Sequence, residues 1–168
     1  INTANNGLRL IKASKIAIRD DGGDAQYLLT VLEDITERRR SEQHISYLAH
    51  NDSLTGMPNR TSFLKHLFDT LDGASKNGNR FAIMCLDLDR FKAINDQNGH
   101  ATGDAVLQVF AKVARDTLRA TDIVGRLGGE EFAALLPSTA PEAAVSAERV
   151  RAALAATPIL SHGRSIRE

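Results

Sequence analysis

The sequence predicts an α+β fold, in which a central, mostly antiparallel sheet carries packed helices. Three observations lead to this prediction. A continuous apolar run over residues 81–87 predicts a strand. The pair Gly128-Gly129 stands between two further apolar runs and predicts a β-hairpin. Amphipathic stretches predict helices at about 61–71, 104–118 and 140–156, and the polar stretch 72–79 after the first of them predicts a loop. The helix at 140–156 has Pro141 in its first turn and is expected to turn four side chains inward: Ala144, Val145, Val150 and Leu154.

The first 34 residues predict two strands joined by a turn. Residues 8–18 show patches of period-two alternation, residues 20–23 have a turn sequence, and residues 26–32 are rich in strand-forming side chains. Because an isolated hairpin is only marginally stable in water, we do not expect this segment to be a domain by itself.

A charged helix is predicted over residues 35–50. Asp34 followed by Glu37 has the spacing of a capping box, and apolar residues are sparse, chiefly Ile45 and Leu48. The helix is too short for a self-sufficient coiled coil, which needs at least three heptads. It is either a solvated connector or a linker that sets the angle between two copies of the following domain. The neighbouring segments favour the linker.

The predicted strand at 81–87 ends in a carboxylate cluster. Asp87 lies at its carboxyl end, Asp89 follows two residues later, and Lys92 follows five residues later. An ionised carboxylate at the end of a buried strand needs a compensating charge, which a divalent cation supplies. A lysine at this place can reach a phosphate as a mobile charge. The alternative for Asp87 is a cap at a strand-to-helix junction.

The polar, glycine-punctuated segment at 95–104 is predicted to be a loop. Asp104 then opens an amphipathic helix, whose dipole would favour its charge. The other interpretation is purine recognition. One carboxylate accepts two hydrogen bonds from the ring N–H and the exocyclic amine of guanine, and the amide of Asn95 can serve the same base or the ribose.

The predicted hairpin carries a second pair of carboxylates. Gly128 and Gly129 are expected to form a tight turn with positive φ, and Glu130 and Glu131 follow directly. Backbone without side chains lets a bulky ligand approach, and adjacent carboxylates suit a magnesium-bound nucleotide. For this motif alone, the alternative is a plain hairpin with two solvent-facing glutamates.

The composition argues against some classes of function. The 168 residues include 21 acidic and 21 basic side chains, so no long-range field favours nucleic acid or an anionic membrane. No apolar run approaches the roughly 20 residues that span a bilayer. We therefore expect a cytoplasmic protein. If the chain is part of a longer protein, that protein could be tethered to a membrane by a segment outside these 168 residues. The single Cys85 is expected to pack inside a buried strand.

Four motifs in order carry a family resemblance. They are Asp52-Ser53-Leu54-Thr55-Gly56-Met57-Pro58-Asn59-Arg60, the segments 87–96 and 99–107, and Arg126-Leu127-Gly128-Gly129-Glu130-Glu131-Phe132. From about Asn51 onward the chain resembles GGDEF-domain diguanylate cyclases, with the turn in its Gly-Gly-Glu-Glu-Phe form. The resemblance implies the palm-like sheet of nucleotide cyclases and polymerases. Residues 33–38 resemble the exit motif of a PAS sensor domain, so the hairpin before them would be that domain's last one.

The resemblance implies a role for each matching residue. Magnesium, with manganese as the alternative, would be held by Asp87, the backbone carbonyl of Leu88, Glu130 and Glu131. Glu130 would also take the proton from an attacking 3′-hydroxyl, and Lys92 would neutralise charge on the triphosphate. Further substrate contacts would come from Phe91, Asn95, His100, Asp104, Gly128 and Gly129. Arg119 and Asp122 have the spacing of the family's inhibitory product site; the alternative for them is a surface ion pair.

The implied reaction joins two GTP molecules into cyclic di-GMP with loss of two pyrophosphates. Two protomers of a homodimer would face each other with one GTP each, under the control of the PAS sensor, and cyclic di-GMP would be both product and inhibitor. The alternative is a catalytically silent module that binds GTP or cyclic di-GMP. The presence of all the catalytic-site carboxylates, Lys92 and Asn95 favours catalysis.

The implied organisation has three parts: the end of a PAS domain at 1–34, a signalling linker helix at 35–50, and a GGDEF domain at 51–168. Proteins of this family continue with a further strand, a short helix and two phosphate-binding basic residues. The chain is therefore expected to be a fragment, incomplete at both ends, of a full-length protein that is catalytic. For the fragment itself, the alternative is an inert chain with only a structural role.

Overall fold

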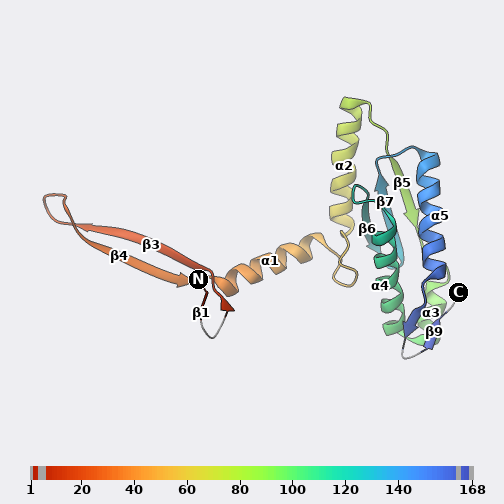
Figure 1. Cartoon of the computed structure of the whole chain (residues 1–168), viewed down its shortest axis with the longest axis horizontal. Helices are drawn as coiled ribbons and strands as arrows, with labels where there is room; N and C mark the ends of the chain where they lie inside the picture. Colours follow the sequence, from red (N-terminus) through yellow and green to blue (C-terminus); the bar gives the residue numbers. More distant parts are fainter. Residues whose placement is uncertain (1, 4–6, 162–163, 167–168) are drawn as a thin grey trace. The chain divides into compact units, whose positions relative to one another are not determined.

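The computed structural model describes residues 2–3, 7–161 and 164–166. The fold is α+β, and the chain divides into two compact units, Ile1–Ala49 and His50–Glu168, each of which is described by itself (Figure 1). Residues 1, 4–6, 162–163 and 167–168 lie outside the described residues, so the ends of the predicted segments 1–34 and 51–168 fall there.

The first unit is built on a long antiparallel hairpin. Strands β3 (Ile11–Arg19) and β4 (Ala25–Asp34) pair in a register that sets Ile16 opposite Leu29. A short pair, β1 (Asn2–Thr3) with β2 (Gly7–Leu8), precedes it. The apolar side chains of β3 and β4 are exposed, with Ile16 at 55% and Leu29 at 49%. The hairpin therefore buries little apolar surface of its own.

Helix α1 (Thr36–His50) begins against the base of that hairpin. Asp34 Oδ1 accepts hydrogen bonds from the N–H and the hydroxyl of Thr36, at 3.0 and 2.6 Å. The hydroxyl oxygen of Thr36 in turn accepts from the N–H of Leu10 at 2.9 Å. The capping box predicted between Asp34 and Glu37 is wrong, because Asp34 binds Thr36 instead and the carboxylate of Glu37 pairs with Arg40.

The second unit contains a three-stranded antiparallel sheet in the order β5-β7-β6. The strands are β5 (Ala82–Leu86), β6 (Ile123–Gly128) and β7 (Glu131–Leu136). The central strand β7 is buried from Phe132 to Leu136. Strand β5 lies at an edge among the described residues, and it leaves Ile83 50% exposed and Cys85 exposed. The expectation that Cys85 packs inside a buried strand is therefore wrong.

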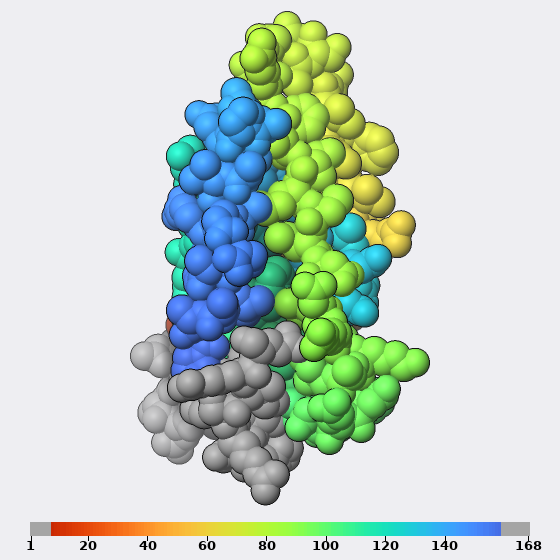
Figure 2. All heavy atoms as spheres, turned by 90° about the vertical axis from the view of Figure 1, so that its right-hand side faces the viewer, coloured from red at the N-terminus to blue at the C-terminus, as the bar shows by residue number. Residues whose placement is uncertain are grey.

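Helices cover both faces of this sheet (Figure 1). Helix α2 (Arg60–Asn77) lies on one face, where Phe63 packs with Ala133 and Leu135. Helices α4 (His100–Thr117) and α5 (Ala140–Ala156) lie on the other, where the larger core includes Phe110 and Phe132 with ring centroids 4.4 Å apart. Figure 2 shows α5 beside the segment that contains β5, in agreement with the contacts between these elements. A terminal pair follows, β8 (Ile159–Ser161) with β9 (Arg164–Ile166).

Two segments predicted as loops are helical. Helix α2 continues to Asn77 and ends at Gly78, whose φ of 69° gives a left-handed cap, so the loop expected at 72–79 is mostly the last turns of a helix. The loop expected at 95–104 is also wrong: helix α3 (Phe91–Asn98) occupies its first part, and α4 begins at His100 rather than Asp104. Only Gly99, with φ 83°, separates the two helices.

Helix α5 has the predicted bounds, but one side of it was assigned incorrectly. Val150 is buried as expected, whereas Ala144 and Val145 face outward and Val145 is 62% exposed. Ala143 takes the inward place instead. A helix rich in alanine has a weak apolar stripe, so the sequence pattern leaves the rotation of such a helix loosely defined.

Candidate active site

The pairing of β5 with β7 brings the two predicted carboxylate clusters to one end of the sheet. Leu86, the last residue of β5, pairs with Phe132 of β7. Asp87 follows Leu86 directly, and Glu131 precedes Phe132 directly, so the antiparallel register places both beside the same pair. Glu130 comes one residue further, in the turn between β6 and β7. The sheet therefore places Asp87, Glu130 and Glu131 at the same end of its strands.

The turn itself is displaced by one residue from its predicted position. Gly128 is the last residue of β6 and pairs with Glu131, so the central residues are Gly129 and Glu130 rather than the two glycines. A bulge between Arg126 and Gly128 produces this shift. Gly128 has φ 149° and Gly129 has φ 52°, and an added Cβ at either would meet nothing within 4 Å. The glycines are therefore needed for backbone conformation, and they leave open space beside the turn.

Arg126 links this turn to the loop of residues 51–59, which follows α1. Its Nε and Nη2 donate to the carbonyl oxygen of Gly129 at 3.0 and 2.8 Å. Its Nη1 donates to both carboxylate oxygens of Asp52, at 3.0 and 3.1 Å. Asp52 also accepts from the N–H and hydroxyl of Thr55. Partial burial acts to raise the pKa of Asp52, but the hydrogen bonds from Thr55 and Arg126 outweigh it and lower the pKa below its usual value.

The turn between β5 and α3 has an unusual backbone. Arg90 has φ 55° and is the only residue other than glycine with positive φ among those described. Directly after it, the N–H of Phe91 donates to the carbonyl oxygen of Leu88 at 3.3 Å. A left-handed residue before the first turn of a helix directs successive N–H groups to one side, which suits an anion. Lys92 lies exposed in that first turn.

Asn95 lies where α3 packs against α4. Its Oδ1 is buried without a hydrogen-bond partner in the described part of the chain. Gly103 of α4 makes this packing feasible: an added Cβ there would overlap Asn95 Oδ1 and would lie 2.9 Å from Asn95 Cγ and 3.1 Å from Phe91 Cζ. Phe91 itself is buried in the core. Its side chain thus supports α3 from inside, and its contact with substrate stays a prediction.

His100 and Asp104 are both exposed and stand four residues apart in the first turns of α4. This spacing places them on one face of the helix. They share the end of α4 with Gly103, against which Asn95 packs. The three side chains predicted to bind the nucleoside therefore come from two neighbouring helix segments.

The donors for a metal ion are present but do not form a complete site. Within residues 2–3, 7–161 and 164–166, no three His, Cys, Asp or Glu side chains gather closely enough to hold an ion. Asp87 and Glu131 are exposed, Glu130 is half-buried, and the Leu88 carbonyl oxygen has a second lone pair besides the one that accepts from Phe91. Magnesium is commonly held by one or two carboxylates together with phosphate and water oxygens. The donor set fits magnesium brought in with a phosphate ligand.

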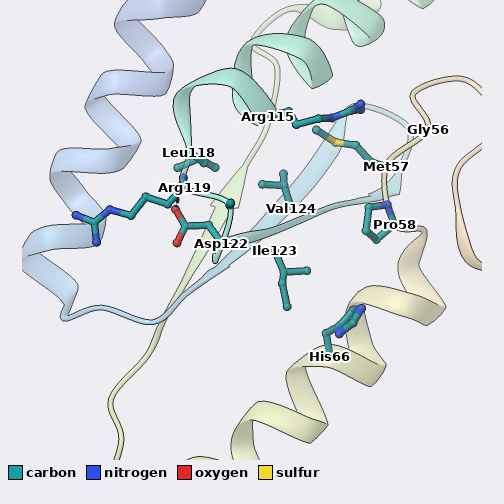
Figure 3. A pocket seen from close by; sticks show the side chains of 11 residues that line it. Gly56, Met57, Pro58, His66, Arg115, Leu118, Arg119, Asp122, Ile123 and Val124 are labelled. Atoms are coloured by element: carbon teal, nitrogen blue, oxygen red, sulfur yellow. Dashed lines mark hydrogen bonds between the residues drawn. The ribbon is translucent and has the colours of Figure 1, made fainter.

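A separate pocket of about 470 Å³ lies at the far ends of α4 and β6. Figure 3 shows its lining, which includes Met57 and Pro58 from the loop, His66 of α2, Arg115, Asp122 and Ile123. Asp122 does not pair with the guanidinium of Arg119. Its carboxylate accepts from the backbone N–H of Arg119 at 2.8 Å, and its own N–H donates to the Arg119 carbonyl at 2.9 Å.

The side chain of Arg119 extends away from His66 and Ile123 in this pocket (Figure 3). Its charge acts on Glu142 at the start of α5. The pKa of Glu142 is lowered first by the N–H and hydroxyl of Thr139 and then, more weakly, by Arg119. The predicted pair Arg119 and Asp122 is thus held in one tight turn, with the cationic group at the rim of the pocket.

Three residues that support the candidate site were not predicted as parts of it. Arg126 and Asp52 hold the turn, and Gly103 makes room for Asn95. Each carries a signal in the sequence: a lone charge inside an apolar hairpin, an acidic residue opening a loop after a helix, and a glycine inside an amphipathic helix. Their role depends on contacts between distant segments, which those signals do not specify.

Residues 49–167 match the protein family described as diguanylate cyclase, GGDEF domain. The chain belongs to this family. It is 44% identical over 124 residues to "Probable diguanylate cyclase DgcE" of Escherichia coli K12, which covers 74% of this chain and 11% of DgcE. It is 41% identical over 148 residues to diguanylate cyclase TpbB of Pseudomonas aeruginosa, covering 86% of this chain and 34% of TpbB. The chain thus spans about a third or less of these curated relatives.

Solved structures of GGDEF domains have the same fold. The GGDEF domain of TpbB from Pseudomonas aeruginosa superposes with a TM-score of 0.66 at 43% identity, covering 70% of each chain. The coiled coil and GGDEF domain of DgcB from Caulobacter crescentus, in complex with cyclic di-GMP, superposes with a TM-score of 0.71 at 26% identity, covering 78% of this chain and 69% of that one. Among the described residues of this GGDEF protein, none of the helices is long and apolar enough to span a bilayer.

Proposed function

We propose that this GGDEF domain condenses two GTP molecules into cyclic di-GMP with release of two pyrophosphates. The observation that carries the proposal is the register of β5 and β7, in which Leu86 pairs with Phe132. It brings Asp87 to the same end of the sheet as Glu130 and Glu131, shortly before the left-handed turn at Arg90 that opens α3. Carboxylates and an anion-binding turn at the same end of the sheet suit a nucleoside triphosphate.

The phosphates of GTP are proposed to bind at the turn between β5 and α3. The backbone N–H groups in the first turn of α3 would donate to the phosphates, and Lys92 adds a mobile positive charge. Gly128 and Gly129 leave space for the nucleotide beside the hairpin. Asn95, His100 and Asp104 recognise the base and ribose, and the unpaired Oδ1 of Asn95 gains a partner when the nucleotide binds.

Magnesium, with manganese as the alternative, is proposed to bind Asp87, the Leu88 carbonyl, Glu130 and Glu131 together with the phosphates. Bound there, the ion would neutralise negative charge on the phosphoryl oxygens. The protein's own contribution is positioning and proton transfer. Glu130 accepts the proton of the 3′-hydroxyl of one GTP. The oxygen of that hydroxyl forms a bond to the α-phosphorus of the second GTP, and pyrophosphate leaves as the bond to it breaks.

The reaction requires two such sites facing each other, so the proposed active form is a homodimer. One domain positions one GTP, and a second copy must bring the other within bonding distance. Helix α1 offers one means of pairing, because Ile45 and Leu48 are exposed three residues apart on one side of it, at 67% and 43%. A PAS sensor before α1 would regulate this pairing through the hydrogen bonds that join Asp34, Thr36 and Leu10. GTP as substrate places the enzyme in the cytoplasm.

A second candidate function is product binding at the pocket beside Arg119. The pocket is not lined by the residues of the candidate active site. Arg119 can turn its guanidinium toward a phosphate while Asp122 holds the backbone of the turn through a hydrogen bond. The expected result is that Arg119→Ala weakens cyclic di-GMP binding, measured by calorimetry, and leaves GTP binding intact. Equal loss of both ligands would argue against a separate product site.

Mass-spectrometric detection of cyclic di-GMP after incubation with GTP and magnesium tests the main proposal. The unaltered chain is expected to form product, and Glu130→Gln, which keeps the size of the side chain but cannot accept the proton, is expected to lose it. Chelation of the metal by EDTA should abolish product in the same assay. GTP binding by the unaltered chain without product would support the silent binding module instead.

A further inference from the structure

One side chain joins the turn that carries Glu130 to the loop that follows α1. The guanidinium of Arg126 donates to the Gly129 carbonyl through Nε and Nη2, at 3.0 and 2.8 Å, and to the Asp52 carboxylate through Nη1, at 3.0 and 3.1 Å. The Arg126 side chain is only 13% exposed and that of Asp52 only 23%. The pair between Arg126 and Asp52 is therefore partly shielded from water, where it is stronger than at the surface, whereas the contact with the Gly129 carbonyl is exposed.

The contact with Gly129 acts on Glu130 through the backbone. The carbonyl of Gly129 and the N–H of Glu130 belong to the same planar peptide group. Two hydrogen bonds to that carbonyl fix the orientation of the plane, and with it the direction in which the Glu130 side chain leaves the turn. Gly129 alone would not hold this orientation, because glycine at φ 52° has wide conformational freedom.

The loop at the other end of the contact closes on the last residue of α1. The N–H of Asn59 donates to the carbonyl of His50 at 3.0 Å, and the N–H of Asp52 donates to the carbonyl of Met57 at 2.7 Å. The backbone N–H of Arg126 also donates to the Pro58 carbonyl at 3.0 Å. A shift at the end of α1 therefore reaches Asp52 and Pro58, both of which Arg126 holds.

Only arginine has the donors for this arrangement. Its rigid guanidinium presents N–H groups in two directions, so Nη1 serves Asp52 while Nε and Nη2 serve Gly129. A lysine has one nitrogen and cannot bind both groups in the same geometry. The substitution Arg126→Lys thus keeps the positive charge and removes the connection.

We propose that Arg126 is the positioning residue through which the loop after α1 sets the orientation of Glu130. Asp52 is the residue of the loop that binds the Arg126 side chain, and it does not itself contact the turn. The proposal rests on the proposed function in so far as Glu130 serves the reaction, and its structural part stands on the contacts alone.

Hydrogen–deuterium exchange and steady-state kinetics on the same chain test the proposal. Three variants are compared with the unaltered protein: Arg126→Lys, Asp52→Asn, and the control Gln108→Ala. Gln108 of α4 donates from Nε2 to the Leu54 carbonyl at 3.3 Å, so the control removes a contact to the same loop without involving the turn.

Both test variants are expected to speed amide exchange in the hairpin segment 127–131, and the control is not. Exchange that rises in this segment for Asp52→Asn is the decisive result, because Asp52 does not contact the turn. The kcat of Arg126→Lys is expected to fall on the order of tenfold to a hundredfold, as for a misplaced catalytic group, with KM for GTP changed less than about threefold. If the ion pair had only a structural role, its loss would lower thermal stability without lowering kcat selectively over KM.

Faster exchange limited to residues 51–59 in Asp52→Asn, or unchanged kcat in Arg126→Lys, would overturn the proposal. The two kinds of failure are distinguishable. Absence of product from the unaltered chain would count against cyclase activity of this chain, whereas the exchange comparison decides the connection between loop and turn without any turnover.

Discussion

Gly103 determines how closely α3 and α4 approach each other at the proposed nucleoside-binding residues. An added Cβ would overlap Asn95 Oδ1 and press on Phe91 Cζ at 3.1 Å. The Phe91 ring is fixed in the core, so the amide of Asn95 is the group that has to move. A substitution at the buried Gly103 is therefore expected to displace Asn95 and so to disturb the base recognition that we propose for it.

Gly103→Ala is expected to weaken GTP binding about five- to tenfold, because displacing the Asn95 amide loses one hydrogen bond, which contributes about 1–1.5 kcal/mol. Isothermal titration calorimetry measures the change. The matched control is Gly73→Ala in α2, where an added Cβ meets nothing within 4 Å. That control should raise the free energy of unfolding by about 0.5–1 kcal/mol and leave GTP affinity unchanged. Unaltered affinity in Gly103→Ala would contradict the assignment of Asn95.

Asp52 makes stability depend on pH in the acid range. Its pKa in the folded state is lowered, so its contribution is fully present above the usual aspartate pKa, about 3.9, and is lost as pH falls through the folded value. Asp52→Asn removes this contribution, at a cost of roughly 1–2 kcal/mol near neutral pH for a hydrogen bond to a charged group. The difference in unfolding free energy between the two proteins should narrow from pH 5 toward pH 2. Urea denaturation at several pH values measures it, and a constant difference would show that the carboxylate charge is unimportant.

At the scale of elements, β6 lies against the loop 51–59 at closer range than a side chain allows. A Cβ on Gly125 would come within 2.9 Å of the Pro58 carbonyl and 3.0 Å of Phe63 Cβ. This close approach lets the N–H of the next residue, Arg126, reach the Pro58 carbonyl. The strand, the loop and the first turn of α2 thus form one packed layer behind the candidate active site.

Gly125→Ala is expected to destabilise the protein by about 1–3 kcal/mol, as overpacking of a closely packed site does. Because one obstacle is backbone, relaxation cannot come from a flexible side chain alone. Equilibrium unfolding in urea gives the value, with Gly73→Ala as the reference for the effect of the substitution itself. A loss below about 0.5 kcal/mol, the range of ordinary surface changes, would mean that the loop moves away at little cost.

The elements that the sequence predicted correctly are those with a strong local signal. Pro141 near the start of an alanine-rich segment marked α5, and the glycine pair marked the hairpin. The missed helical segments combine polar residues with glycine: Gly73 lies inside α2, and Gly99 separates α3 from α4. Packing against the sheet and against each other stabilises these helices, and local propensity does not include that contribution. An apolar run also does not say where its strand stands in the sheet, which explains the exposed Cys85.

The candidate site divides in the same way. Titratable residues that follow a strand or a turn, such as Asp87 and Glu130, can be predicted as candidates from the sequence, because an ionised group at such a place requires a compensating partner. The residues that orient them cannot. Arg126 and Asp52 are 74 positions apart, and only the fold brings them within 3.0 Å. That the active site needs a supporting layer is general; which residues form it is a property of the tertiary structure.

At the scale of the whole molecule, charge neither favours nor opposes self-association. The chain has 21 acidic and 21 basic residues and a formal net charge of +0, so two copies meet without long-range repulsion or steering. The homodimer that we propose would then form through short-range contacts such as the exposed apolar side chains of α1, among them Ile45. Association of this kind should depend only weakly on salt and directly on protein concentration.

The proposed homodimer therefore predicts a concentration-dependent specific activity. With GTP and magnesium in excess, cyclic di-GMP formed per chain should rise in proportion to protein concentration below the dissociation constant of the dimer and level off above it. The reason is that a monomer binds one GTP but cannot position the second. A dilution series followed by mass spectrometry measures the dependence, and GTP bound per chain in the same series is the control, since it should stay constant. Constant specific activity down to concentrations at which sedimentation shows only monomer would mean that one copy suffices, and the facing-site mechanism would have to be abandoned.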